Sequence, residues 1–170
     1  MWTARRIFKE LTDPDLRRTI LTSFWKHGEN NSRLMAQMQL AKALHFRDET
    51  IRKMPPEKKA DLLASRAASP DFEQFLEIAL MQYHTHDQAN MLGAFLDQWQ
   101  IPHENGAIET DDYTPPTEEQ VRNAVAALRE QYDPRQIRVY LATAGLLMAG
   151  PWRDATWPVV EEMGEETGAA

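Results

Sequence analysis

The sequence predicts an all-α protein, a single-domain helical bundle of about seven to eight helices with one long irregular connection over residues 101–116. Three observations predict this class. Apolar residues recur at three- and four-residue spacing along most of the chain, glycine is scarce (7 residues), and Asp-Pro or Ser-Pro pairs precede several periodic segments. Such pairs mark helix starts, because Asp or Ser caps the first turn and proline is favoured within it.

The N-terminal segment, residues 1–12, predicts a short amphipathic helix with apolar side chains on one face and basic ones on the other. A helix this short is marginal by itself, so we expect it to pack on its own protein rather than on a membrane surface. The pair Asp13-Pro14 then opens a second helix, which ends near Gly28.

A third helix is predicted from a cap at Ser32 to about residue 44, ahead of a shorter helical piece over 48–53. We expect the apolar residues of this third helix to face the core: Leu34, Met35, Met38, Ala41 and Leu44. The pair Pro55-Pro56 opens the next helix, which runs to about Ala67.

The segment 71–100 has apolar residues at helical spacing along its length, but the phase of these residues changes in the middle. At about 100° per residue, the two halves of one straight helix would present opposite apolar faces. We therefore predict a break or kink near 84–87. Thr85 is expected to cap the second half, with Gln88 completing a capping box.

Residues 101–116 have no helical periodicity, and no alternating pair of β-strands stands out there or elsewhere. Two further helices are predicted after this connection, over about 117–132 and 133–148, each opened by a capping residue.

The last segment, residues 150–170, is predicted to be an appended acidic tail that contains tryptophan and proline. We expect Trp152 and Trp157 to pack on the domain or on a second copy of it, since leaving both in water would expose a large apolar patch. The domain prediction is thus a single helical domain over 1–170, with 1–12 and 150–170 as appended segments.

Composition excludes several kinds of chemistry. The chain has no cysteine, which excludes disulfides, thiolate zinc sites and thiol nucleophiles. It shows no signal-peptide pattern and no apolar run of about 18 residues, so we expect a cytoplasmic protein without a membrane span. The net charge of −7 is uneven: residues 1–60 hold 13 Lys/Arg against 7 Asp/Glu, and the remainder 6 against 19. This asymmetry suits an acidic partner, or complementary halves within one chain or a dimer.

The most distinctive local pattern spans residues 39–54, in which apolar and small residues frame a short turn before a basic helix: Ala41, Leu44, Phe46, Thr50 and Ile51. This segment resembles the helix-turn-helix of DNA-binding regulators. The resemblance implies that Ala41 packs helix on helix and that Arg47, Thr50, Arg52 and Lys53 face DNA.

Two positions depart from the helix-turn-helix pattern. His45 stands where the turn usually has glycine, so a positive φ costs more there. Arg47 stands where a serine-like cap is usual, although Asp48 could cap instead. The alternative interpretation of residues 39–54 is an ordinary corner between two helices.

The histidines suggest a second alternative, a metal or small-molecule site near 84–87 and 101–113, with His84, His86 and Asp87 as candidate ligands. On a helix, His84 and His86 point about 200° apart, whereas His84 and Asp87 share a face. The segment 101–113 lacks the spacing of a calcium loop.

No nucleophile elbow or phosphate-binding loop occurs, and the paired carboxylates Glu161 and Glu162 lie in a polar tail, so we expect neither a cofactor nor an enzymatic activity. The sequence favours a non-enzymatic protein–protein interaction module that self-associates. DNA binding through residues 39–54 and a small-molecule or metal site near 84–87 are the alternatives.

Overall fold

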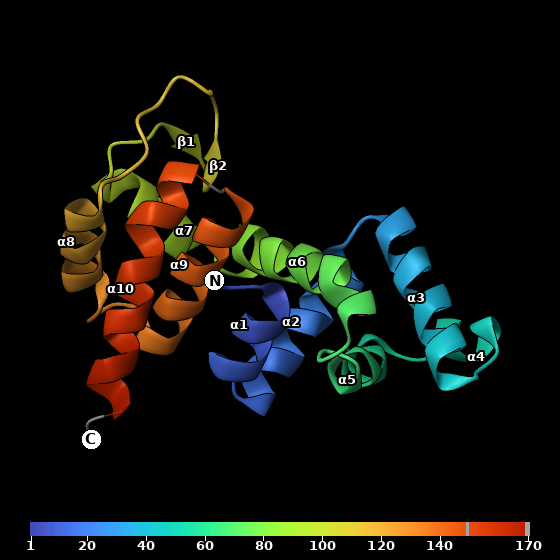
Figure 1. Cartoon of the computed structure of the whole chain (residues 1–170). Coiled ribbons are helices and arrows are strands. Elements are labelled where there is room, and N and C mark those ends of the chain that lie inside the picture. The colour runs from blue at the N-terminus through green and yellow to red at the C-terminus, as the bar shows by residue number, and fades with distance from the viewer. Residues whose placement is uncertain (149, 169–170) are drawn as a thin grey trace. The chain divides into compact units, whose positions relative to one another are not determined.

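The computed structural model describes residues 1–148 and 150–168, and the side chains within them up to residue 165. It confirms the all-α class, since its described elements are ten α-helices, a 3₁₀ turn at Pro70–Phe72, a π-helical turn at Tyr83–Asp87 and one two-stranded hairpin (Figure 1). The helices are α1 (Ala4–Glu10), α2 (Pro14–His27), α3 (Asn30–Leu44), α4 (Asp48–Arg52), α5 (Pro56–Ser65), α6 (Glu73–Gln82), α7 (Ala89–Gln98), α8 (Glu118–Leu128), α9 (Pro134–Leu147) and α10 (Gly150–Gly168). None of the described helices combines the length and apolarity needed to cross a membrane.

The chain folds into two compact units. We call residues 3–87 the N-terminal unit, and residues 1–2 together with 88–170 the C-terminal unit. The predicted single domain over 1–170 stays a prediction, and positions 149, 169 and 170 of it lie outside the described residues.

The N-terminal unit is built around α2, which packs on α5 and α6. Its start confirms the predicted cap, because Oδ1 of Asp13 accepts a hydrogen bond from the Leu16 amide at 2.7 Å and Pro14 follows in the first turn. The buried apolar residues of α2 are Ile20, Leu21, Phe24 and Trp25. Helix α1 packs on α6 and buries Ile7 and Phe8, so its apolar face is covered by its own unit.

The break predicted near 84–87 is present, but a π-helical turn makes it, not a capping box. Residues Tyr83–Asp87 form this turn between α6 and α7. Thr85 does not cap α7: its hydroxyl donates to the carbonyl of Met81 at 2.9 Å, and Gln88 precedes α7 without a side-chain cap. The wider turn changes the helical phase, which reconciles the two apolar faces.

The C-terminal unit packs α10 on α9 and α8, and α7 on α8. Its core is aromatic: the ring of Phe95 lies 5.0 Å from that of Tyr140, and the ring of Trp99 lies 5.5 Å from that of Trp152. The capping residue predicted at the next helix start is confirmed as Thr117 at α8, where Thr117 and Gln120 form a capping box, each side chain bonding the other's backbone amide.

The segment predicted as an appended tail is instead a long helix, α10, with Pro158 inside it. Its Trp152 is 4 % exposed and lies within the aromatic core of the C-terminal unit. Packing on α9 supplies stabilisation that a proline-containing segment lacks in isolation.

The predicted irregular connection contains a short antiparallel hairpin, β1 (His103–Glu104) and β2 (Ala107–Ile108). Its turn is Asn105-Gly106, and both residues have positive φ, at 50° and 86°. The Asn-Gly pair favours this kind of tight hairpin turn and was the available sequence signal for it.

Candidate interaction surface

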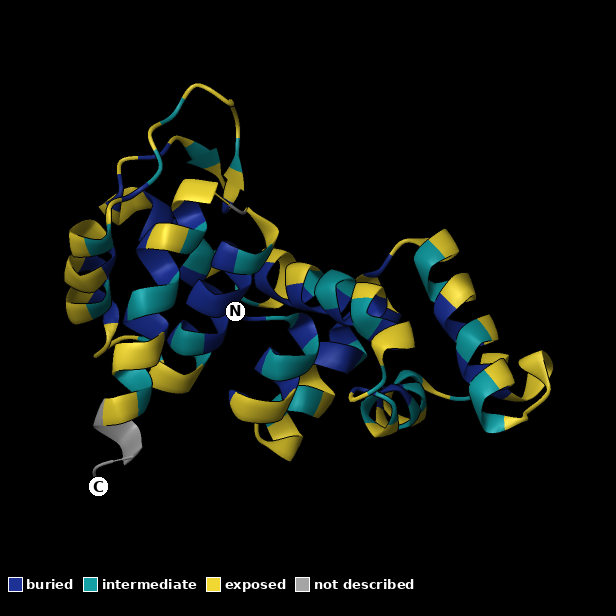
Figure 2. Ribbon diagram, viewed as in Figure 1, coloured by how far each residue is buried: buried dark blue, intermediate teal, exposed yellow. Residues whose placement is uncertain are grey.

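The prediction that the apolar residues of α3 face the core is wrong for three of them. Leu34 is 50 % exposed, Met35 55 % and Met38 57 %. The buried face of α3 consists of Ala36, Gln37, Leu40 and Ala41. Figure 2 shows exposed residues recurring along this helix. We call Asn31, Leu34, Met35, Met38 and Lys42 the α3 outer face, since all five are exposed.

Two overlapping apolar faces in one helix explain the wrong prediction. At about 100° per residue, Leu34 and Met38 fall within a quarter-turn of each other. Ala36 and Leu40 fall on the opposite side, whereas Ala41 falls within about 20° of Leu34 and is nevertheless buried. Both faces satisfy helical periodicity, so the sequence alone does not distinguish them.

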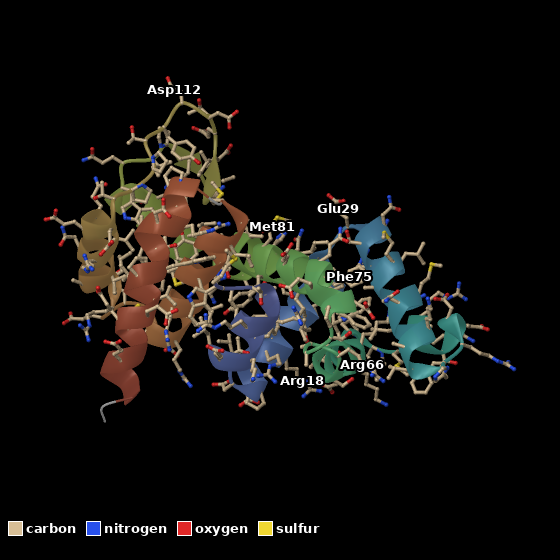
Figure 3. All side chains as sticks on the ribbon, viewed as in Figure 1. Arg18, Glu29, Arg66, Phe75, Met81 and Asp112 are labelled. Atoms are coloured by element: carbon tan, nitrogen blue, oxygen red, sulfur yellow. The ribbon has the colours of Figure 1, made fainter. Side chains whose placement is uncertain are left out.

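The inner face of α3 is held by polar contacts as well as by apolar burial. The side-chain amide of Gln37, only 5 % exposed, donates to Oδ1 of Asp48 at 2.9 Å. Arg66, which Figure 3 labels at α5, donates to the carbonyl of Ala43 at 3.4 Å. Rotating α3 to bury its outer face would break both of these hydrogen bonds. The two bonds therefore keep the outer face of α3 turned toward solvent.

A left-handed residue ends α3. His45 has φ 56° and ψ 34°, the positive φ that the helix-turn-helix comparison requires at this position. The amide of Phe46 donates to the carbonyl of Ala41 at 2.9 Å, and the amide of His45 approaches the carbonyl of Lys42 at 3.5 Å. This is the hydrogen-bond pattern of a Schellman cap. The turn leaves Phe46 44 % exposed, which adds an aromatic ring near the end of α3.

The four residues proposed to face DNA are all exposed on or beside α4. Helix α4 has five residues, and the Lys53 ammonium lies 2.7 Å from a carboxylate oxygen of Glu49. The Arg52 guanidinium lies 3.9 Å from the same carboxylate. Ile51 is fully buried, and Asp48, the alternative cap expected from the sequence, bonds Gln37 and does not cap α4.

The candidate metal ligands have different environments. His84 is 4 % exposed, and burial lowers its pKa to about 3, so it is neutral at physiological pH. His86 is exposed and stacks on His27 with ring centroids 4.9 Å apart. Among the described residues, no group of three His, Asp or Glu side chains is arranged to hold a metal ion.

The 101–113 half of that alternative lies in the C-terminal unit, whereas 84–87 lies in the N-terminal unit. The imidazole of His103 bonds Oδ1 of Asp97 at 2.9 Å, and its Nδ1 accepts from the Gly106 amide at 3.1 Å. A Cβ at Gly93 would meet this ring at 3.0 Å. Nε2 of His103 therefore links the β-hairpin to α7, and Nδ1 accepts a hydrogen bond within the hairpin's own turn.

None of the family models, curated proteins or solved structures compared with this chain matches it. The inference of function therefore depends on the residues themselves.

Proposed function

We propose that this protein is a non-enzymatic protein–protein interaction module that self-associates through the α3 outer face. The supporting observation is the row of exposed apolar side chains, Leu34, Met35 and Met38, on one side of a well-formed helix. Contiguous exposed apolar side chains mark interaction sites, and methionine adapts its shape to a partner.

The arrangement of this face favours a second copy as the partner. Its central line reads polar, apolar, apolar, polar at Asn31, Met35, Met38 and Lys42, with spacings of four, three and four residues. An antiparallel pair of α3 helices about a two-fold axis places Met35 opposite Met38 and Asn31 opposite Lys42. The face is thus complementary to itself, with apolar residues in the middle and polar residues at both ends.

The expected association is weak. One face of a single helix is smaller than the roughly 800 Å² per partner of a stable interface. We therefore expect a dimer with a dissociation constant on the order of micromolar, which dilution reverses.

Sedimentation velocity over about 1 to 200 µM tests this proposal. Met38→Glu should abolish the dimer, because it places two unpaired carboxylates in an apolar contact. Met81→Glu is the matched control, since Met81 is also exposed (42 %) and lies in the same unit on α6. A monomer throughout the range, or equal effects of the two variants, would refute self-association through α3.

Cross-linking tests the register, because the chain contains no cysteine of its own. A mixture of Met35→Cys and Met38→Cys proteins should form a mixed disulfide faster than either variant forms one with itself. Equal rates for the three pairs would contradict the antiparallel register.

DNA binding through residues 39–54 is the second candidate, supported by the left-handed His45 and by the exposure of Arg47, Thr50, Arg52 and Lys53. Fluorescence anisotropy with a labelled DNA duplex at low and high salt tests it. Arg47→Gln should reduce both the affinity and its salt dependence. Binding unaffected by this variant would exclude residues 39–54 as the contact.

A further inference from the structure

The N-terminal unit contains a groove with a volume of about 500 Å³ between α1 and the end of α5. Basic side chains line it from one side, and small side chains line it from the other. Its lining includes Arg5, Arg6, Lys9, Arg17, Ala64 and Ala68. It lies on helices other than α3 and α4, so it is separate from the surface of the proposed function.

Two of the four cations are already neutralised. The Arg5 guanidinium lies 2.6 Å from a carboxylate oxygen of Glu73, and the Arg6 guanidinium lies 3.0 Å from one of Glu10. These pairs position the rim of the groove without leaving strong positive charge on it.

The other two cations have no carboxylate partner among the described residues. Lys9 is exposed, in the last turn of α1. Arg17 is half-buried, and its Nη2 donates to the carbonyls of Phe8 (2.7 Å) and Thr12 (3.2 Å) at the end of α1. Its Nε is directed to the Thr12 hydroxyl, so the Nη1 group remains available to a ligand.

The other side of the groove has room for an apolar side chain. Ala64, Ala67 and Ala68 contribute only methyl side chains, and Phe8, at 1 % exposure, also lines the groove. The groove therefore combines an apolar wall with two unpaired cations.

We propose that this groove binds an acidic peptide segment of another protein, with one apolar side chain against the alanines and flanking carboxylates on Lys9 and Arg17. Guanidinium and ammonium N–H groups are the usual donors to carboxylates in acidic motifs, and here Nη1 of Arg17 and the Lys9 ammonium group supply them. Nucleic acid fits less well, since Phe8 is the groove's aromatic residue and it is too buried to stack on a base. The inference does not rest on self-association through α3.

Fluorescence anisotropy with a labelled peptide, one leucine between two pairs of glutamates, tests the proposal on the full chain. We expect Lys9→Gln to weaken binding about three- to ten-fold, and raised salt to weaken it as well. Lys58→Gln is the matched control, an exposed lysine on α5 outside the groove, and should change affinity less than about two-fold.

A second variant tests the apolar wall. Ala64→Leu fills the space beside the cations and should weaken the peptide without changing any charge. Arg17→Gln is less suitable, because Arg17 also bonds the end of α1. Equal losses for Lys9→Gln and Lys58→Gln, or equal binding of a peptide with glutamines in place of the glutamates, would overturn the proposal.

Two further measurements distinguish peptide binding from self-association and from nucleic-acid binding. The Met38→Glu protein should bind the peptide as the wild type does, so loss of the dimer and loss of peptide binding are independent results. A single-stranded oligonucleotide that binds more tightly than the peptide, with the same dependence on Lys9, would overturn the choice of a peptide ligand.

Discussion

The two compact units of this chain use their charged and apolar residues differently. The N-terminal unit carries 14 Lys/Arg and 12 Asp/Glu, whereas the C-terminal unit carries 5 and 14. The C-terminal unit buries Trp99, Tyr140 and Trp152 in one aromatic core. The N-terminal unit leaves Met35 and Met38 in solvent on α3.

We infer from this difference that the C-terminal unit owes its stability to its aromatic core, whereas the N-terminal unit carries the surfaces for recognition. Aromatic side chains in a closed core contribute much of the free energy of folding. Exposed methionine and leucine side chains contribute little to the monomer and are available to a partner. Both proposed interaction sites, the α3 outer face and the α1–α5 groove, lie in the N-terminal unit. The following predictions test this contrast, from the largest expected effect to the smallest.

Trp152→Ala should lower the free energy of unfolding of the C-terminal unit by about 3–5 kcal/mol, the cost of a large cavity. Trp152 packs on Trp99 and donates its indole N–H to the hydroxyl of Tyr113 at 3.3 Å. Met38→Ala, on the exposed face of α3, should change stability by less than about 0.5 kcal/mol in dilute solution. Amide hydrogen exchange, followed separately in the N-terminal and C-terminal units, measures the stability change in both variants. A comparable loss from Met38→Ala would contradict the contrast.

Acid should destabilise the N-terminal unit through His84. Its pKa is about 3 in the folded protein, below the ordinary value of 6.5, so the unfolded chain binds more protons between these values. The contribution of neutral His84 to the free energy of unfolding is complete above pH 6.5 and is lost as the pH falls toward 3. The expected loss is up to about 1.4 kcal/mol per pH unit.

Urea unfolding at a series of pH values measures this dependence, with His84→Gln expected to flatten the slope. The control is His86→Gln, which replaces an exposed histidine two residues further along the same turn. A slope that survives in His84→Gln would show that other groups cause it.

Thr117→Ala should cost about 1 kcal/mol by removing the capping box at the start of α8. Thermal unfolding detects the loss, and it should be confined to the C-terminal unit. Thr117→Ser retains the hydroxyl and should preserve most of the stability. If alanine and serine behave alike, the cap does not stabilise α8.

His45→Gly should raise stability by about 0.5–1 kcal/mol, because glycine adopts the left-handed conformation without the strain of a Cβ. The same change at Lys42, inside α3, should cost about 1 kcal/mol. Chemical denaturation of the two variants compares them. A loss of stability from His45→Gly would contradict the left-handed end of α3.

Local signals predicted most of the helix boundaries. Asp13-Pro14 and Thr117 start helices as expected, because a cap acts within one turn of the chain. Asn105-Gly106 was an equally local hairpin signal in a segment predicted to be irregular. The phase change in 71–100 correctly located a break, but the π-helical turn at Tyr83–Asp87 has no comparable capping signature.

The candidate surface was harder to predict than the fold. Leu34, Met35 and Met38 have the spacing of a core face, and they would have been assigned to the core in most helices. The burial of Leu40 and the contacts of Gln37 with Asp48 and of Arg66 with Ala43 show which side of α3 faces inward.

The sequence by itself determined the helical class, the starts of the capped helices, and the absence of thiol chemistry from this chain, because these depend on composition and on residues close together in the chain. The tertiary structure decided which face of α3 is buried and that the proline-containing segment α10 is helical. Both outcomes depend on packing against elements distant in sequence. Helical periodicity shows that a helix has an apolar side, but burial is decided by the neighbour that covers it.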